Sequence, residues 1–530
     1  MAVIVSNIRL PLEAEDAQAL DTALRRAKLP QALHGRAYVV RCTPDLRHRQ
    51  AHLVYTVGID LAGDEEEAAV RRAASPSVTR RRPTAFLPQP GKEELRGRPV
   101  VVGFGPAGMF AGLLLAQCGY RPLIVERGAN VDERAAAVSR FWKTGELDMQ
   151  SNVQFGEGGA GTFSDGKLTT RIGDPLCEQV LRQFVRFGAP EAIARLAKPH
   201  IGTDRLRGVV RAIREEILRL GGSIRFQTPL TGLELNAGQI KAARMGAETV
   251  PTGALILAAG HSARDTFEML LQSGVRLEPK PFSVGVRIEH LQEQIDRALY
   301  GRYTGHPRLP KGEYQLSLRK GEQAVYTFCM CPGGTVVAAA SEAGGVVTNG
   351  MSNYRRDGRN ANAALVASVD AFAAPLDGVA FQRQLEQAAF AAGGGNFRAP
   401  CQTVGGFLDG FAALPNGAVR PTYPAGVSPA RLDTLLPPPV TDLLKTGLRA
   451  FDKRLHGFSS PEAVLTGVET RTSSPVRIPR GADYMALGIE GLYPTGEGAG
   501  YAGGIMSAAV DGLRVAAAII ERYAPPRENA

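Results

Sequence analysis

The stretch that decides the fold is residues 99–128, which read PVVVGFGPAGMFAGLLLAQCGYRPLIVERG. Three valines at 100–102 predict a buried strand, which runs into the glycine turn GFGPAG at 103–108. The apolar run after this turn predicts a helix, and Pro122–Val125 predicts a second strand that ends in Glu126. A strand, a glycine turn, a helix, a strand and an acid in this order begin a doubly wound α/β fold.

The three glycines of this turn are typical of a dinucleotide site. Gly103 permits the sharp turn, Gly105 lets the backbone approach a pyrophosphate, and Gly108 lets the helix pack closely on the sheet. The helix N-terminus would present its unpaired N–H groups to the phosphates. Glu126, 23 residues after Gly103, would accept hydrogen bonds from ribose hydroxyls and disfavours a 2′-phosphate, so the pocket should hold FAD or NAD. The predicted site also includes Pro106, Ala107 and Arg127.

Two later segments favour FAD over NAD. Residues 491–519 predict a strand, a glycine-rich turn and a helix that opens at Gly503, Gly504 and Ile505. In flavoproteins that resemble this segment, an acid after the strand holds the ribityl chain, and Gly496 and Glu497 stand at that place. The dipole of the following helix would stabilise reduced flavin. Residues 253–267 add a strand ending in Ala259 and Gly260, which resembles the turn that returns the chain to the cofactor.

Composition and charge exclude several classes of protein. The chain has 530 residues, 44% hydrophobic and 22% charged, which predicts two to four globular domains. Its six cysteines include no CxxC pair, which argues against a structural zinc site and for reduced thiols. The net charge of +10 is spread along the chain, so it is weak evidence for a nucleic-acid partner. No signal peptide or membrane span is expected, and we predict a cytoplasmic protein with no bound metal.

The order of elements predicts a FAD-binding domain that is interrupted by a second domain. The first residues show a strand–helix–strand–strand–helix order, which predicts a small ferredoxin-like α+β module. Proline and arginine then indicate a linker that includes Arg80–Arg82. A later region rich in glycine, proline and β-type runs predicts an inserted α+β substrate domain. The expected boundaries are 1–75 for the small domain, 76–98 for the linker, 99–280 and 461–530 for the two parts of the FAD-binding domain, and 281–460 for the inserted domain.

Several long motifs resemble a widespread bacterial family of FAD-dependent dehydrogenases, or NAD(P)/FAD-dependent oxidoreductases. They are SNVQFGEGGAGTFSDGKLTTR at 151–171, PFSVGVRIEH at 281–290, the segment 328–365, LYPTGEGAGYAGGIMSAAVDG at 492–512 and, near the N-terminus, VVRCTPDLRHRQAHLVYTVGID at 39–60. The resemblance implies a glutathione-reductase-type FAD fold with an inserted domain and a small N-terminal domain. It names no agreed substrate. The chain departs from the family pattern at Cys42–Arg47, so no role is expected of that loop.

The loop GEGGAGTFSDGK at 156–167 would pass beside the flavin in similar flavoproteins. Its glycines would let the backbone approach the ring without a Cβ clash. Asp165 and Lys167 could bond flavin heteroatoms or substrate, and a cation near flavin N1 would stabilise the reduced anion. The alternative is that Asp165 and Lys167 pair with each other on a surface turn. The predicted cofactor contacts in this loop are Gly158, Gly159, Ala160, Gly161, Thr162, Asp165 and Lys167.

Candidate catalytic side chains lie outside the nucleotide motif. Cys329 and Cys331 are two apart on a predicted strand, so alternation places both thiols on one face, as a redox couple, a nucleophile or buried core. Lys167 is a candidate through its charge. His261 follows the Ala259–Gly260 turn and could reach the cofactor, or it could cap the next helix, as Ser262 also could.

Polar residues of the inserted domain admit two interpretations. Arg287 and Glu289 share a strand face, which favours an internal ion pair; the alternative is a clamp for an anionic substrate that combines Arg287 with Arg355, Arg356 or Arg359. The asparagines of 349–362 could line a substrate pocket, or they could cap turns and a helix that begins near Ala361.

The sequence therefore predicts an oxidoreductase with non-covalently bound FAD that transfers a hydride between the flavin and a small organic substrate. No second glycine fingerprint is present, so NAD(P)H, if it is the electron donor, would dock over the flavin as a transient partner. One alternative is a flavoprotein that binds RNA or protein through its N-terminal module and Arg80–Arg82. The other is a FAD-dependent reductase of an unsaturated lipid or isoprenoid. The oligomeric state is left open.

Overall fold

The computed structural model describes residues 2–47, 50–62, 65–81, 86–170, 172–370, 372–413 and 416–526. The chain divides into two compact units. Unit 1 comprises residues 1–87, 173–200 and 300–310, and unit 2 comprises residues 88–172, 201–299 and 311–530. The segments 173–200 and 300–310, which we predicted to belong to the FAD-binding and inserted domains, therefore cluster with the N-terminal residues.

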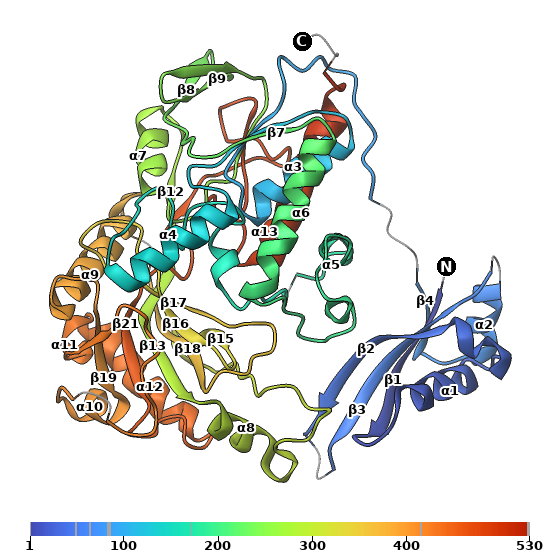
Figure 1. The fold of residues 1–530 in the computed structure, drawn as a ribbon. Helices are drawn as coiled ribbons and strands as arrows, with labels where there is room; N and C mark the ends of the chain where they lie inside the picture. The colour runs from blue at the N-terminus through green and yellow to red at the C-terminus, as the bar shows by residue number, and fades with distance from the viewer. Residues whose placement is uncertain are drawn as a thin grey trace. The chain divides into compact units, whose positions relative to one another are not determined.

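Unit 1 is built on a four-stranded antiparallel sheet of order β2-β3-β1-β4 (Figure 1). The buried face alternates along β3, where Leu53, Tyr55 and Val57 point into the core. The segment predicted as a linker contains β4, which pairs with β1, so the linker prediction was wrong over those residues. The elements are β1 (Ala2–Pro11), α1 (Asp16–Arg26), β2 (Ala37–Asp45), β3 (His52–Asp60), α2 (Glu65–Ala73), β4 (Val78–Arg81) and α5 (Leu176–Arg186).

A five-stranded parallel sheet of order β23-β11-β5-β6-β7 forms the first half of unit 2. Its three central strands, β11, β5 and β6, are short, fully apolar runs, as expected for strands covered on both faces. Helix α3 packs against α13 and α6 (Figure 1), and α3 is buried around its whole circumference. The bounds are β5 (Val100–Val102), α3 (Pro106–Gln117), β6 (Leu123–Val125), α4 (Val131–Thr144), α6 (Thr203–Arg219), β7 (Ser223–Arg225), β11 (Leu255–Leu257), α7 (Arg264–Gln272), β23 (Leu492–Pro494) and α13 (Ile505–Arg522).

A mixed seven-stranded sheet of order β14-β15-β18-β13-β21-β19-β20 forms the second half of unit 2. Its central strand β13 is buried on both faces, and α12 packs against β18, β15 and β13. The bounds are β13 (Phe282–Leu291), β14 (Ser317–Lys320), β15 (Gln323–Cys331), β18 (Asn360–Val369), α9 (Asp377–Gly393), β19 (Ala399–Thr403), β20 (Val427–Pro429), α12 (Pro438–Asp452) and β21 (Val464–Glu469).

Three smaller antiparallel pieces complete unit 2. They are the meander β8 (Gly232–Asn236), β9 (Gln239–Met245) and β10 (Glu248–Pro251), the pair β16 (Thr335–Ala338) and β17 (Thr348–Met351), and the pair β12 (Glu278–Pro279) and β22 (Val476–Arg477). Among the described residues, no helix combines the length and the apolar character that crossing a bilayer requires.

Two predictions about the inserted region require correction. The helix expected near Ala361 is the strand β18, in which every residue from Asn360 to Ala367 is buried between β15 and β13. The boundary predicted at 460/461 falls too early, because β21 pairs with β13 inside the seven-stranded sheet. Pairing across the sheet, which a local pattern does not reveal, decides both cases.

Candidate functional site

The glycine turn after β5 is shaped by close approaches that only glycine allows. Gly103 has φ +95°, and a Cβ there would lie 2.3 Å from the carbonyl oxygen of Ala258. A Cβ on Gly108 would lie 1.9 Å from the carbonyl oxygen of Gly103, so α3 packs directly on the turn. Gly105 is different, because a Cβ there would meet only the Cα of Gly159, at 3.6 Å. The protein alone therefore leaves room at Gly105.

The glycine-rich loop lies against this turn and reaches α13. The N–H of Gly158 donates to the carbonyl oxygen of Phe104 at 2.8 Å. A Cβ on Gly159 would lie 3.0 Å from the Cα of Gly105, and one on Gly161 would lie 3.0 Å from Ile505 Cγ1. The predicted cofactor contacts Ala160 and Thr162 belong to a single 3-10 turn, Ala160–Phe163, between these points. The glycine turn, the glycine-rich loop and the start of α13, which are far apart in the sequence, thus meet at one place.

Arg134 of α4, which the sequence analysis did not single out, holds this loop in shape. Its guanidinium is fully buried and donates to five backbone carbonyls, which belong to Asn152, Val153, Gly156, Glu157 and Gly159. Burial lowers the pKa of Arg134 to about 10, which leaves the side chain charged at neutral pH. An arginine inside an amphipathic helix pattern carries no sequence signal for such a role.

Glu126 lies beside the same turn, and its carboxylate is bound by backbone amides. One oxygen accepts from Phe104 N at 2.8 Å, and the other accepts from Gly128 N and Gly156 N, both at 2.9 Å. The side chain therefore ties the glycine turn to the glycine-rich loop, and its contact with a ribose stays a prediction. Arg127 donates to both carboxylate oxygens of Asp265 at 2.8 Å and stacks over Phe155.

The middle and C-terminal segments meet through the pairing of β11 with β23. A Cβ on Gly498 would lie 2.5 Å from the carbonyl oxygen of Gly260, and His261 Nδ1 lies 3.3 Å from Glu497 Oε1. His261 Nε2 is buried and has no hydrogen-bond partner among the described residues. Ser262 does not cap α7, because its hydroxyl donates to Gln154.

Helices α3 and α13 both begin without a side-chain cap among the described residues. Their N-terminal N–H groups are consequently available to an acceptor from outside the helix. Gly503 and Gly504 are exposed, and a Cβ on either would touch nothing within 4 Å. Gly496, at φ +75°, approaches Ala107, where a Cβ would lie 2.8 Å from the alanine Cβ. The two open helix ends suit a ligand that carries phosphates and an electron-accepting ring.

Asp165 and Lys167 do not form the predicted surface pair. Asp165 is buried, accepts from Arg356 Nε at 3.0 Å and is also hydrogen-bonded to Ser352. Lys167 Nζ lies 2.9 Å from Glu313 Oε1, and Arg356 Nη1 lies 3.3 Å from the other oxygen of Glu313. The four charges therefore alternate in sign along one cluster, and the contact of Asp165 or Lys167 with a flavin stays a prediction.

Arg287 and Glu289 do not form the predicted ion pair. Arg287 Nη2 lies 2.6 Å from Glu469 Oε1 on β21, and the same guanidinium donates to Asn349 and Asn362. Glu289 instead accepts from the Thr422 hydroxyl at 2.6 Å and from the Asn360 amide at 3.0 Å.

The anionic-substrate clamp is contradicted as well. The guanidiniums of Arg287 and Arg356 are occupied by carboxylates, and that of Arg359 donates to the Ala418 carbonyl. Three asparagines of this region satisfy buried charges: Asn349 and Asn362 accept from Arg287, and Asn360 donates to Glu289.

Cys329 and Cys331 do not share one regular strand face, because β15 is irregular between Phe328 and Cys331. Cys329 has φ +44°, and Cys331 Sγ lies 3.3 Å from the carbonyl oxygen of Cys329. Both cysteines are free thiols; Cys329 is partly exposed and Cys331 is buried.

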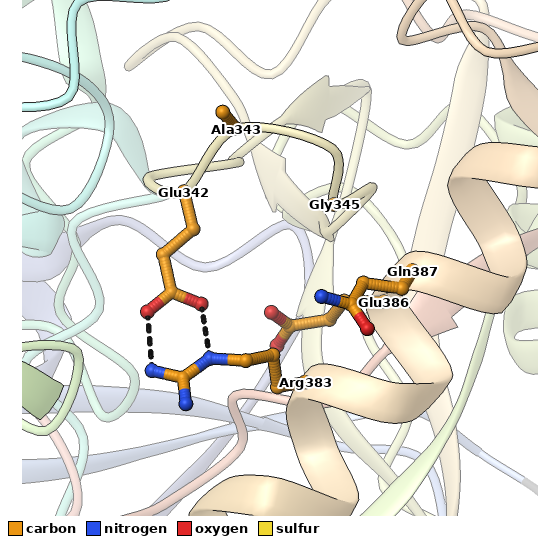
Figure 2. A pocket seen from close by; sticks show the side chains of 6 residues that line it. All are labelled: Glu342, Ala343, Gly345, Arg383, Glu386 and Gln387. Atoms are coloured by element: carbon orange, nitrogen blue, oxygen red, sulfur yellow. Dashed lines mark hydrogen bonds and ion pairs between the residues drawn. The ribbon is translucent and has the colours of Figure 1, made fainter.

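A separate cavity of about 150 Å³ lies beside α9, where Glu342, Arg383 and Glu386 line it (Figure 2). It is smaller than the roughly 300–1,000 Å³ that small-molecule sites occupy. Glu386 is fully buried between Arg264, at 2.8 Å, and Arg471, at 3.0 Å. This cluster is part of the packing between α9 and the start of α7, and we assign it no substrate.

Comparison with known proteins finds a matching family and a similar protein. Residues 281–472 match the family described as "FAD-dependent protein, C-terminal domain-like". An uncharacterized protein of Clostridium beijerinckii is 51% identical over 443 residues, which cover 82% of this chain and 83% of that protein. The description of this family supports FAD as the cofactor.

Solved structures match more distantly. A geranylgeranyl bacteriochlorophyll reductase-like protein from Thermoplasma acidophilum is 12% identical, with a TM-score of 0.35, over 80% of this chain and 78% of its own. The L-amino acid deaminase of Proteus vulgaris is 11% identical, with a TM-score of 0.35, over 83% of this chain and 94% of its own. Similarity at this level says nothing further about the chain.

Proposed function

The chain belongs to the same family as the Clostridium beijerinckii protein, and from this premise we propose that it is a FAD-dependent oxidoreductase. In this proposal it transfers a hydride between the flavin and a small organic substrate, and NAD(P)H is the electron donor to test first. The observation that carries the proposal is the convergence of four glycine-bearing segments on the uncapped N-termini of α3 and α13.

Each segment has a part in holding the cofactor. The turn at Gly103–Ala107 and the N-terminus of α3 would take the pyrophosphate, and the loop at 158–162 would lie along it. The N-terminus of α13 would face the flavin ring. When bound, FAD supplies an atom that accepts or gives up a hydride; the protein supplies position and charge.

His261 and Glu497 lie side by side in this cradle, with His261 Nδ1 3.3 Å from Glu497 Oε1. In our proposal Glu497 orients the cofactor, and His261 fixes the position of Glu497. Because the buried Nε2 has no partner among the described residues, it is the atom through which His261 would contact a ligand.

The alternative of RNA binding through the N-terminal module has less support. Arg80 Nε lies 3.1 Å from Glu66 Oε2, and Arg81 is paired with Glu178, so the charge of this basic run is largely neutralised. Arg82 lies outside the described residues. No contact among the described residues of unit 2 favours a lipid or isoprenoid substrate, and we do not propose one.

The first test is the visible spectrum of the purified protein, followed by anaerobic addition of NADPH and then NADH. A flavin spectrum that bleaches identifies a nicotinamide-driven reductase. Flavin that neither donor bleaches would remove the NAD(P)H part of the proposal, and a colourless protein that takes up no added FAD would remove the whole of it.

Gly105→Ala tests the cradle itself. The added Cβ meets only Gly159 Cα at 3.6 Å, which is ordinary contact, so the protein should fold while the pyrophosphate loses its place. We expect at least a tenfold loss of FAD affinity, about 1.4 kcal/mol. Gly208→Ala on the exposed side of α6, where a Cβ would meet nothing within 4 Å, is the matched control. Equal FAD content in the two variants would contradict the cradle.

A further inference from the structure

Cys329 stands where β15 leaves the regular ladder. The strand pairs with β18 as far as Phe328 and resumes at Cys331, so the two residues between them bulge out. Within this bulge Cys329 has φ +44°, in the left-handed region that non-glycine residues rarely adopt. Backbone conformations of this kind persist only where neighbouring groups hold them, and they gather at functional sites.

Two donors hold the backbone of Cys329. Arg287 Nη1 donates to the Cys329 carbonyl oxygen at 3.0 Å, and the Cys331 thiol donates to the same oxygen at 3.3 Å. The guanidinium is in turn fixed by Glu469. The Cys331 sulfur is thereby folded back onto residue 329, although the bulge has broken the strand alternation that would have placed the two side chains together.

The two thiols are unequal in exposure and in acidity. A hydrogen bond from the Cys331 thiol, together with the positive charges of Arg287 and Lys167, lowers the pKa of Cys329 against the effects of burial and of Asp165. The pKa of Cys331 is raised by that hydrogen bond and by burial. Cys329 is partly exposed whereas Cys331 is buried. A partly exposed cysteine whose pKa is lowered, beside a buried cysteine whose pKa is raised, is the arrangement of an attacking and a resolving thiol.

We propose that Cys329 and Cys331 form a thiol–disulfide exchange site whose substrates are small-molecule disulfides. Partial exposure of Cys329 favours a small disulfide over one on a protein surface. This site does not depend on the proposed flavin reaction, because exchange needs only the two thiols and the disulfide.

The reaction balances in two steps. The Cys329 thiolate attacks one sulfur of the disulfide R–S–S–R; the S–S bond breaks, a Cys329–S–S–R mixed disulfide forms, and the departing RS⁻ takes a proton from water. Cys331 then attacks the Cys329 sulfur, which breaks the mixed disulfide and releases a second RS⁻; the proton of Cys331 passes through water to this departing thiolate. Two protein thiols are oxidised to one disulfide, and the substrate is reduced to two thiols.

The test uses the full-length protein as purified, with its flavin, after reduction and removal of the reductant. The protein is incubated with oxidised glutathione, quenched in acid, alkylated after unfolding and mapped by mass spectrometry. In the wild type we expect an internal disulfide between Cys329 and Cys331. Cys331→Ser should instead retain one glutathione on Cys329, and Cys329→Ser should leave Cys331 as a thiol because Cys331 is buried.

Buried Cys401, whose pKa burial raises to about 12, is the internal control, and we expect at least a tenfold difference in modification between Cys329 and Cys401. Two results would overturn the proposal: both thiols unmodified in the wild type, or no more glutathione on Cys329 in Cys331→Ser than on Cys401. Neither readout uses the flavin spectrum or a nicotinamide, so failure here is distinguishable from failure of the proposed function. Circular dichroism of the serine variants verifies that they are folded.

Discussion

Two buried charges beside the parallel sheet are satisfied in a different way from two around the seven-stranded sheet. Beside the parallel sheet, Arg134 donates to five backbone carbonyls and Glu126 accepts from three backbone amides. Around the seven-stranded sheet, charged side chains bind each other, as in Arg287 with Glu469 and in Glu386 with two arginines. A charge bound to backbone fixes the path of a loop, whereas a charge bound to another charge fixes the packing of two elements.

This difference predicts different consequences when a charge is removed. Removal of a charged side chain that binds backbone groups should disorder the loop that it holds and the cofactor site that depends on this loop. Removal of one member of a buried ion pair should leave the other member uncompensated in a core that excludes water. The free energy of unfolding should then fall without a specific effect on the cofactor.

The largest effect is expected for Glu386→Ala. Its side chain is 1% exposed between Arg264 and Arg471, and its removal leaves the buried guanidinium of Arg471 without a carboxylate and that of Arg264 with Glu342 alone. We expect a loss of about 3–5 kcal/mol in the free energy of unfolding. Arg383→Ala is the control, because Arg383 pairs with Glu342 where both side chains are about one-third exposed; it should cost below about 1 kcal/mol. Similar urea midpoints for the two variants would contradict the distinction.

Arg134→Met tests a buried charge that is bound to backbone carbonyls. It removes five hydrogen bonds and leaves buried carbonyls unpaired, which should cost about 3 kcal/mol and release FAD. Arg140→Met on the same helix removes an exposed charge whose contact with Glu146 is 3.8 Å long. FAD retention and urea unfolding are measured on both variants. Tight FAD binding by Arg134→Met would show that the loop keeps its shape without the guanidinium.

The sequence predicted the parallel half better than the other half, for a physical reason. Strand, glycine turn and helix are decided by neighbours in the chain, so β5, α3 and β6 appear where residues 100–125 predicted them. The partners of Arg287 and Asp165 are decided by which strands become neighbours. Glu469 is 182 residues from Arg287, and Arg356 is 191 residues from Asp165. Alternation predicted that Arg287 and Glu289 share a strand face, but it could not predict which residues lie opposite them.

We expect buried His290 on β13 to make the free energy of unfolding depend on pH, with an effect of intermediate size. Burial lowers the pKa of His290 to about 4. Between pH 6.5 and pH 4, His290 therefore binds a proton in the unfolded chain but not in the folded chain. Stability should therefore fall by about 2 kcal/mol between pH 7.5 and 4.5 on account of this residue. Glu289 and Glu157, whose pKa values burial raises, have the opposite sign. The comparison with His290→Phe isolates the histidine, since both proteins retain the two acids; identical slopes would contradict the shift.

The smallest effect is expected for an ion pair that is well formed but exposed. Arg225 at the end of β7 bonds both oxygens of Glu248, at 2.7 and 2.8 Å, with 40% and 55% of the two side chains exposed. Water and salt screen such a pair, so Arg225→Gln should cost less than about 1 kcal/mol, and less still at 1 M salt. Its geometry is as good as that of the contacts around Glu386. A double-mutant cycle with Glu248→Gln therefore separates the effect of geometry from the effect of burial. A coupling energy above about 2 kcal/mol would mean that pairing itself, and not removal from water, determines how much the charges around the seven-stranded sheet contribute to stability.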